Sequence, residues 1–582
     1  MDDSRSPERT GAARRWSRRP EHGDLLDPGD RRVVYPQRVG VSTRGMVSTQ
    51  HYHATEAGAA MLDAGGNAVD AAVAAAFALG VVEPAASGLG GQSMLLLHLA
   101  ADGRKFCLDG ASRAPNRTPP GGLKRSAHLR GHRATTVPST PAVLAYALKH
   151  YGTKRLDEVL QPAIERAEEG YRVSPLQHYL TRRELKYLRA HSAGALMLKG
   201  GRAPYPIGAL FRQPVLAATL RRLAVAGVED FYQGEIGRAI HADMLANNGL
   251  LRDDDLARIP WPTERRPLAT HFGPMRVFTF PPPGAGRTLI EALNLLAQFP
   301  EAARDPDSPR GALLLAHVIR KANLDRADRP EDPVLFAQEL DLGEDITHLD
   351  YAKRVARRIK GRLLRDTQRV GDSDRPAAER ATEPLPDPPE TGELRGETTH
   401  LSAMDAAGNV VALTQSIERV YGSFSASPAL GFIYNNYMSA FEYEDISHPY
   451  FLRPNAVPWA SVAPTIVFRG PRPWLAVGSP GSERIVSAIL QVLLRLERGA
   501  TPFDAVESPR LHCSVEGKVS LEATRMRDDI PRLLARHGFA IDARDPYSFY
   551  LGCVQLVLRE QDCFLGVADP RRDGSAAGPA ES

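Results

Sequence analysis

The chain has 582 residues, of which 43% are hydrophobic and 24% are charged, with a net charge of +4. Such values are typical of a globular protein that is too long for one average domain. The small net charge gives no indication of nucleic acid or a membrane surface as a partner. Four cysteines (Cys107, Cys513, Cys553 and Cys563) are too few for a disulfide framework, and none lies in a CxxC pair.

Residues 1–40 are rich in Arg, Asp, Pro and Gly and poor in apolar side chains, which predicts a disordered arm. No apolar segment follows its two arginine pairs, so the arm does not have the form of an export signal. We therefore expect a cytoplasmic protein, or an exported one if the true start site differs. The longest apolar run, 71–82, is too short to span a bilayer and predicts a buried helix.

Residues 41–365 are predicted to form a helix-rich part. Ala54–Leu62 and Ala68–Leu79 have helical patterns, with Asn67 as the N-cap of the second helix. The loop Ser87–Gly91 precedes a strand instead of following one, which is the reverse of a dinucleotide-binding fingerprint. The loop at 281–287 lacks the lysine of a phosphate loop. Neither loop predicts a nucleotide cofactor.

Two polar motifs could suggest a metal. His51 and His53 lack an acidic partner at a telling spacing, so structural histidines are the better interpretation. The acidic and basic run at 325–332 (DRADRPED) is typical of a solvated loop or a salt-bridge cluster. We expect no metal and no cofactor.

The segment 366–397 is charged and Pro-rich, with almost no large apolar residues. It cannot bury enough surface to offset its ordering entropy, which predicts a flexible linker. Downstream, 401–405 and 409–417 have the pattern of two strands around a three-residue turn. A tether that ends in a threonine at the start of a strand suggests a self-cleavage point at Glu397–Thr398. An ordinary linker that runs into a strand fits the same features.

The hairpin predicts a neighbour for this threonine. If it is centred on Ala407, Thr398 lies opposite Ser416, with Cβ atoms roughly 5 Å apart. An N-terminal threonine combines a hydroxyl nucleophile with its own α-amino group as the base. Before cleavage that nitrogen is an amide and cannot accept the proton, so the uncleaved chain should be inactive.

A strand followed by a turn at Pro480-Gly481-Ser482 and a helix, 483–496, is expected in the C-terminal part. The backbone N–H groups of Gly481 and Ser482 then lie at a helix N-terminus, where they could stabilise an oxyanion. A tight turn that merely requires glycine is an equally good interpretation. Residues 398–571 are predicted to be β-rich, and 572–582 a disordered tail.

These motifs resemble the γ-glutamyltranspeptidases (γ-glutamyltransferases, or glutathione hydrolases) of the N-terminal-nucleophile hydrolase superfamily. The similar stretches lie between about residues 42 and 570. They are EAGAAMLDAGGNAVDAAVAAAFALGVVEPAASGLGG (56–91), FPPPGAGRTLIEALNLL (280–296), DRADRPEDP (325–333), TTHLSAMDAAGNVVALTQS (398–416), APTIV (463–467) and GSPGSERI (478–485). The resemblance implies an α+β fold, a four-layer αββα sandwich. It also implies a precursor that cleaves itself into two subunits that stay together.

The resemblance implies roles for individual residues. Thr398 matches the nucleophile and Ser416 the second, assisting threonine. Gly481 and Ser482 match the oxyanion glycine pair. Ser461 matches the second serine of a pair that binds the glutamyl α-carboxylate, and Ala460 stands at the first.

The substrate end departs from the family pattern. Ala111 stands where the family has an arginine for the α-carboxylate, and Arg113 follows two residues later. Tyr437 and Ala440 replace the glutamine and aspartate that recognise the α-amino group, and Glu418 replaces an asparagine. Losing charged partners should weaken glutamyl recognition severely, unless Glu418 and Arg113 supply the missing charges.

Three hypotheses follow. The first is a self-processing threonine hydrolase or transferase that passes a γ-glutamyl or related acyl group to water or an amine. The second is an acylase of the same chemistry on another acyl chain, for example glutaryl. The third is an unprocessed homologue that acts as a binding protein.

Overall fold

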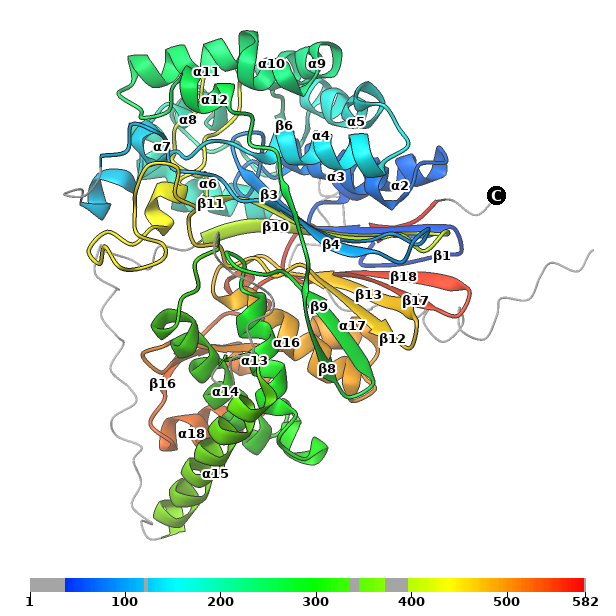
Figure 1. Cartoon of the computed structure of the whole chain (residues 1–582), viewed down its shortest axis with the longest axis vertical. Helices are drawn as coiled ribbons and strands as arrows, with labels where there is room; N and C mark the ends of the chain where they lie inside the picture. The colour runs from blue at the N-terminus through cyan, green and yellow to red at the C-terminus, as the bar shows by residue number, and fades with distance from the viewer. Residues whose placement is uncertain (1–36, 120–123, 334–344, 372–395, 580–582) are drawn as a thin grey trace, which may run out of the picture.

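The computed structural model describes residues 37–119, 124–333, 345–371 and 396–579, which fold around two seven-stranded sheets (Figure 1). Sheet I has the order β19-β2-β10-β11-β3-β4-β7, and sheet II the order β1-β18-β17-β13-β12-β9-β8. Every neighbouring pair within these two sheets is antiparallel.

The strands of sheet I are β2 (Gly45–Thr49), β3 (Gln92–His98), β4 (Lys105–Gly110), β7 (Thr263–Arg265), β10 (Gly396–Asp405), β11 (Val410–Arg419) and β19 (Ser575–Ala577). Those of sheet II are β1 (Val39–Ser42), β8 (Leu268–Phe272), β9 (Met275–Thr279), β12 (Thr465–Arg469), β13 (Arg472–Gly478), β17 (Gln555–Glu560) and β18 (Cys563–Ala568). Shorter strands pair as β5 (Tyr171–Arg172) with β6 (Leu210–Phe211), and as β14 (Leu511–Cys513), β15 (Lys518–Leu521) and β16 (Ala540–Ala543).

Helices cover one face of sheet I (Figure 1). They are α2 (Tyr52–Asp63), α3 (Ala68–Val82), α4 (Thr140–Tyr151), α5 (Leu156–Glu169), α6 (Pro175–Arg183), α7 (Leu185–Ala190), α8 (Ala193–Met197), α9 (Pro214–Ala226), α10 (Val228–Gln233), α11 (Glu235–Ala246) and α12 (Asp253–Ala257). The alanine-rich α3 is buried almost all round and begins at Asn67, whose side chain accepts from Val69 N and Asp70 N. The predicted buried helix and its N-cap are therefore confirmed.

A second helical group lies on the far side of sheet II (Figure 1). It contains α13 (Gly286–Leu296), α14 (Pro309–Asp328), α15 (Leu349–Gly371), α16 (Arg484–Glu497), α17 (Pro502–Glu507) and α18 (Asp529–Arg536). No helix in the described ranges is long and apolar enough to cross a membrane.

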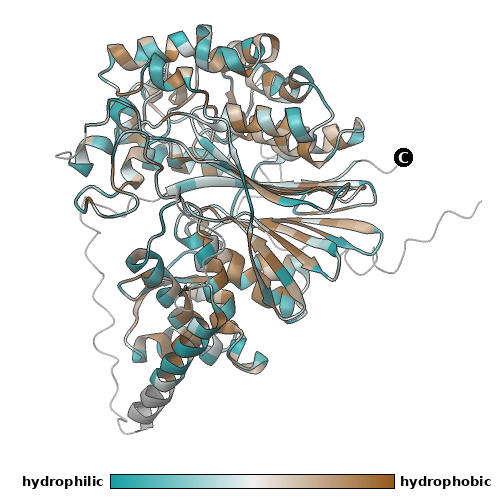
Figure 2. Ribbon diagram, viewed as in Figure 1, coloured by the Kyte–Doolittle hydropathy of each residue, from teal (hydrophilic) through white to brown (hydrophobic). Residues whose placement is uncertain are grey.

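Successive side chains along a strand point to opposite faces of its sheet, so sheet I contributes to two separate parts of the core. Along β10 and β11, Leu401, Ala403 and Leu413 pack toward the helices, whereas Met404 and Ala412 pack toward sheet II. Sheet II meets them with side chains such as Phe278, Ile466 and Val557. The inner strands of sheet II are mostly hydrophobic in Figure 2, because both faces of that sheet are covered.

Three predicted boundaries need correction. The tail predicted at 572–582 is ordered as far as residue 579: Arg572 is buried, and β19 pairs with β2. The end of the predicted arm is also ordered, since β1 pairs with β18 and Arg38 binds carbonyl oxygens of the C-terminal segment. Composition misjudged both ends because a short polar segment gains order when it joins an existing sheet or pairs its charges.

The predicted linker is shorter than 366–397. Helix α15 continues to Gly371, and β10 begins at Gly396, so both ends of the linker belong to regular elements. The remainder, 372–395, lies outside the described residues, as does the arm 1–36.

Candidate functional site

The hairpin β10–β11 carries the predicted junction in the middle of sheet I. Its register pairs Leu401 with Leu413 and Thr399 with Gln415, so the hairpin is centred on Ala407 as predicted. The register shifts between Glu397 and Thr399, where one residue of β10 faces two of β11. This bulge brings the hydroxyls of Thr398 and Ser416 within 3.2 Å of each other.

Ser416 joins the hydroxyl of Thr398 to the carbonyl of the preceding residue. Thr398 Oγ1 donates to Ser416 Oγ, which donates in turn to the Glu397 carbonyl oxygen at 2.6 Å. The Glu418 N–H completes the arrangement by donating to Ser416 Oγ at 2.8 Å. A hydroxyl has one proton and two lone pairs, so Ser416 can donate one of these bonds and accept the other two. The three groups therefore form a directed hydrogen-bond chain that ends on the Glu397 carbonyl.

The Gly-rich loop before β3 makes room for Ser416. A Cβ on Gly91 would lie 2.4 Å from the Ser416 carbonyl oxygen, so a side chain there would displace β11. The loop that resembled a nucleotide fingerprint therefore has a close-packing role beside the site.

The predicted oxyanion turn lies against the same junction. A Cβ built on Gly396 would approach Ser482 Cβ to 2.8 Å, and one on Gly478 would meet the His400 ring at 2.2 to 2.6 Å. Gly396, Thr398 and His400 alternate onto one face of β10, which places Thr398 between these two contacts. Gly481 (φ +121°) and Ser482 (φ +52°) are both left-handed, and helix α16 follows after its N-cap residue, Glu483.

The N–H groups of this turn are available for an oxyanion. The carbonyl oxygens of Gly481 and Ser482 accept from Arg484 N and Ile485 N. Within the described ranges, the N–H groups of Gly481 and Ser482 donate to no protein acceptor. Their position at the N-terminus of α16 favours negative charge.

Tyr437 extends the group of hydroxyls. It lies in the short 3-10 helix Tyr437–Ala440 and is 1% exposed. Burial raises the pKa of its hydroxyl, as does the charge of Glu418, whereas hydrogen bonding to Ser416 and Gln92 acts in the opposite direction. The position that the family uses for a glutamine is thus filled by a neutral phenol beside Ser416.

Glu418 and Arg326 form the charged side of the site. Burial raises the pKa of Glu418 to about 7, although Arg419 and Arg326 lower it. Glu418 is also held in a left-handed conformation, with φ +76°. Burial lowers the pKa of Arg326 to about 10, against the charges of Glu483, Tyr450 and Glu418. The Glu418 carboxylate and the Arg326 guanidinium therefore interact electrostatically in a poorly solvated part of the site.

Arg326 binds the segment that carries Ser461. Its guanidinium donates to Ser461 Oγ at 3.2 Å and to the Ala460 carbonyl at 2.9 Å, and lies 4.7 Å from the centre of the Trp459 ring. Ala460 N in turn donates to the Pro283 carbonyl, so the proline loop at 281–287 supports this segment. A small pocket of about 30 Å³ opens beside it. Its lining includes Arg287, Arg326, Arg329, Tyr450 and Trp459.

Arg113, the other basic candidate, is directed away from Ser461. Arg113 donates to the Asn455 carbonyl at 3.5 Å, and its charge is coupled to Arg258 and Asp109. Ala111 packs against the core between the sheets. The structure therefore brings Arg326, and not Arg113, to Ser461.

Sequence reasoning overlooked Arg326 because the run 325–332 was interpreted as a solvated loop or a salt-bridge cluster. The loop interpretation is wrong for residues 325–328, which end helix α14. Asp325 is 2% exposed, pairs with Lys321 and accepts from the Tyr351 hydroxyl at 2.5 Å. Arg326 could have been found from the similarity of the DRADRPEDP stretch to the family. The charge pattern alone did not point to it.

His51 lies at the start of α2, where its ring accepts from His53 N at 3.3 Å. The described part of the chain contains no group of three or more side chains suited to hold a metal ion.

Comparisons with known proteins agree with this geometry. The family model for gamma-glutamyltranspeptidase matches residues 54–579. The glutathione hydrolase proenzyme of Bacillus subtilis (strain 168) is 30% identical over 578 residues, covering 96% of this chain and 95% of that protein. The acylase ACY 1 proenzyme of Pseudomonas sp. (strain SE83) is 33% identical, covering 81% and 82%.

A solved structure gives the same result. The cephalosporin acylase from Bacillus halodurans superposes with a TM-score of 0.78 at 27% identity, covering 96% of this chain and all of that one. Both curated relatives are named as proenzymes. The chain belongs to the γ-glutamyltranspeptidase family.

Proposed function

We propose that Thr398 is the nucleophile of a self-processing amidohydrolase or acyltransferase. The observation that carries the proposal is the chain of hydrogen bonds from Thr398 Oγ1 through Ser416 Oγ to the Glu397 carbonyl. In self-cleavage, the bond from Thr398 Oγ1 to the Glu397 carbonyl carbon forms and the peptide C–N bond breaks. The nitrogen leaves as an amine that carries the hydroxyl proton. Water then hydrolyses the ester.

In turnover the same hydroxyl attacks an amide of the substrate. The freed α-amino group, with an ordinary pKa of about 7.7–8.0, serves as the base. The N–H groups of Gly481 and Ser482 stabilise the oxyanion, where one such donor contributes about 10²–10³-fold in rate. Water or an amine takes the acyl group.

We also propose that the fold is the four-layer αββα sandwich of the N-terminal-nucleophile hydrolases and that both fragments stay together as a heterodimer. Sheet I supports this arrangement. After cleavage, β11, β19 and β10 from Thr398 onward would belong to residues 398–582, whereas β2, β3, β4, β7 and the first two residues of β10 would belong to residues 1–397. Because β2 lies between β19 and β10, separating the fragments would break backbone pairing on several edges.

The preferred acyl group carries a distal carboxylate. Arg326 stands beside Ser461 with donors on a planar guanidinium, which suits a carboxylate. Both γ-glutamyl and glutaryl chains have this group at the same distance from the scissile amide. A γ-glutamyl chain brings an ammonium as well, and Ala440 and Tyr437 offer it no charge. The geometry therefore favours a glutaryl-type chain, with γ-glutamyl as the second candidate.

The test compares three anilides: glutaryl, γ-glutamyl and butanoyl. We expect kcat/KM for glutaryl anilide to exceed that for butanoyl anilide by about tenfold or more, because only the former pairs with Arg326. Equal values for these two substrates would contradict the distal-carboxylate proposal. A γ-glutamyl anilide that is cleaved faster than glutaryl at every pH would establish the second candidate instead.

Because Glu418 titrates near neutral pH, we expect the relative kcat/KM of the γ-glutamyl and glutaryl anilides to depend on pH. With a pKa of about 7, Glu418 is mainly neutral at pH 6 and mainly charged at pH 8. Only the charged form attracts an ammonium, so the γ-glutamyl-to-glutaryl ratio of kcat/KM should rise about threefold or more over this range. Arg326, Arg419 and Tyr437, which are coupled to Glu418, titrate well outside it.

Titration of the Thr398 amine affects the turnover of both substrates equally, so it cancels in the γ-glutamyl-to-glutaryl ratio of kcat/KM. Glu418→Gln should remove the pH dependence of the ratio and leave the glutaryl rate nearly unchanged. If the ratio keeps its slope in that variant, Glu418 is not the group that senses the ammonium.

A further inference from the structure

Arg572 follows the last strand of sheet II, and its side chain is buried beside the Glu397–Thr398 junction. It is 3% exposed and forms an ion pair with the Glu397 carboxylate. The same guanidinium pairs with Glu83 at 2.9 Å and approaches the Thr398 carbonyl oxygen at 3.5 Å. Burial alone would lower the pKa of Arg572, but the charges of Glu397 and Glu83 raise it above its ordinary value. Arg572 therefore connects the C-terminal segment to both sides of the scissile peptide.

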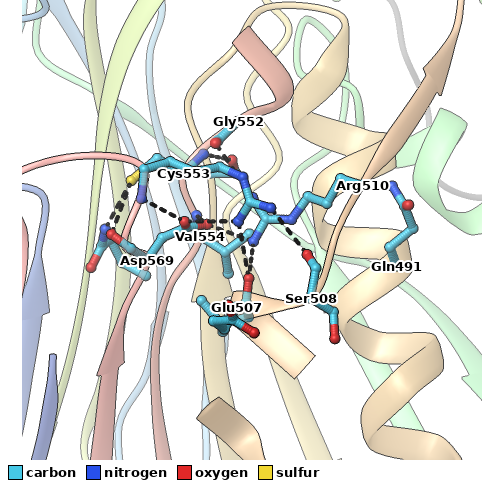
Figure 3. Close-up of polar contacts among 12 residues, drawn as sticks. Gln491, Glu507, Ser508, Arg510, Gly552, Cys553, Val554 and Asp569 are labelled. Carbon is cyan, nitrogen blue, oxygen red and sulfur yellow. Dashed lines mark hydrogen bonds and ion pairs between the residues drawn. The ribbon is translucent and has the colours of Figure 1, made fainter. Parts of the chain in front are cut away.

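Ion pairs just before Arg572, and a hydrogen bond to its own carbonyl, fix the backbone that carries it. Asp569 pairs with Arg510 at 2.5 Å and accepts from Val554 N at 2.8 Å (Figure 3). Arg571 pairs with Glu522 at 2.7 Å, and Arg38 donates to the Arg572 carbonyl. These groups are nearly all buried, where paired charges resist displacement. The guanidinium of Arg572 consequently has a defined position relative to β10.

The Glu397 carboxylate connects the Arg572 guanidinium to the peptide bond between Glu397 and Thr398. Its Oε1 accepts from the Thr398 N–H at 3.0 Å while it is paired with Arg572. On the other side of the peptide, Ser416 Oγ donates to the Glu397 carbonyl at 2.6 Å. The peptide that has to break is thus held at both its N–H and its C=O. Rotation of the peptide plane would sacrifice both contacts.

We propose that Arg572 is a positioning residue for self-cleavage, which acts through the Glu397 carboxylate to hold the Glu397–Thr398 peptide facing the Thr398 hydroxyl. This inference rests on the proposed cleavage at that bond. Without Arg572, two carboxylates, Glu397 and Glu83, would lie buried with no cation between them. Glu397 would then turn toward water, and its acceptor oxygen would leave the Thr398 N–H. Arg572 takes no part in bond making, since the proton of the Thr398 hydroxyl goes to the leaving nitrogen.

A double-mutant cycle separates positioning from a general structural role. The variants are Arg572→Gln, Glu397→Gln and their combination, and the readout is the rate at which full-length precursor converts to two fragments on a denaturing gel. We expect each single substitution to slow cleavage by about tenfold or more. The combination should be no slower than the slower single variant, because both substitutions break one contact. Arg572→Lys, which keeps the charge, should recover part of the rate.

Two further variants guard against misfolding. Glu83→Gln combined with Arg572→Gln removes one charge of each sign and should keep the thermal melting temperature of the precursor near that of Arg572→Gln or above it. Arg536→Gln, at an exposed position on α18, should cleave at the wild-type rate.

The outcomes distinguish this proposal from the proposed function. A wild-type small fragment that does not begin with Thr398 on N-terminal sequencing would overturn the proposed function itself. Wild-type cleavage at that bond together with an unimpaired Arg572→Gln would overturn only the positioning role. Multiplicative slowing in the double variant would do the same, because independent effects indicate that Arg572 does not act through Glu397.

Discussion

Replacing Thr398 with valine is expected to leave the protein as a single 63.5 kDa chain that shows no fragments after prolonged incubation. Valine keeps the β-branched shape that suits β10 but has no hydroxyl, so no bond to the Glu397 carbonyl carbon can form. Amidase activity should fall by about 10³-fold or more, because the nucleophile is lost and the α-amino group is never released. Denaturing electrophoresis and an anilide assay measure the two effects.

Thr398→Ser is the matched control for this experiment. It retains the hydroxyl and the hydrogen bond to Ser416, so it should cleave more slowly than wild type and yet yield a small fragment that begins at residue 398. A wild-type protein that stays as one band would favour the binding-protein hypothesis over both enzyme hypotheses. Fragments from Thr398→Val with the wild-type junction would show that another group attacks the bond.

The second large effect concerns Arg326. Arg326→Met keeps the bulk of the side chain against Trp459 but removes the cation beside Ser461. Loss of a buried charge-assisted hydrogen bond costs about 1.5–3 kcal/mol, or roughly 10–150-fold in kcat/KM. We expect this loss for glutaryl and γ-glutamyl anilides and a much smaller one for butanoyl anilide, which has no carboxylate to bind.

Arg113→Met provides the comparison for Arg326. Arg113 is the arginine nearest in sequence to the position where the family has one, but its guanidinium is directed at Asn455. The substitution should change kcat/KM for all three anilides by less than about threefold. The reverse result, a large effect at Arg113 and none at Arg326, would move the carboxylate site to the Arg113 side.

Much of the junction was predictable because it depends on local pattern. The turn residues and the alternation of β10 and β11 were enough to place Thr398 opposite Ser416, and the register bears this out apart from the bulge. The bulge itself was not predictable, since it depends on how the end of β11 fits against the Gly91 loop and on the bond from Glu418 N to Ser416. That bulge determines the 2.6 Å contact on the Glu397 carbonyl.

The charged side of the site was not predictable in the same way. Arg326 is 72 residues before Thr398 in sequence, and it reaches Ser461 only because α14 packs behind sheet II. Arg572 belongs to a segment whose composition predicts disorder, and it becomes ordered by pairing with Glu397 and Glu83. Buried ion pairs of this kind join residues hundreds of positions apart, and neither partner carries a local signal.

The sequence by itself predicted the Glu397–Thr398 junction, its hairpin and the turn before α16, because turns, alternation and capping act over a few residues. Only the tertiary structure decided which charges meet at the site. Desolvation raises the pKa of Glu418, and the packing of separate elements selects Arg326 over Arg113 and brings Arg572 to the Glu397–Thr398 junction. Electrostatic energy depends on distance through space and on burial, and a linear sequence contains neither.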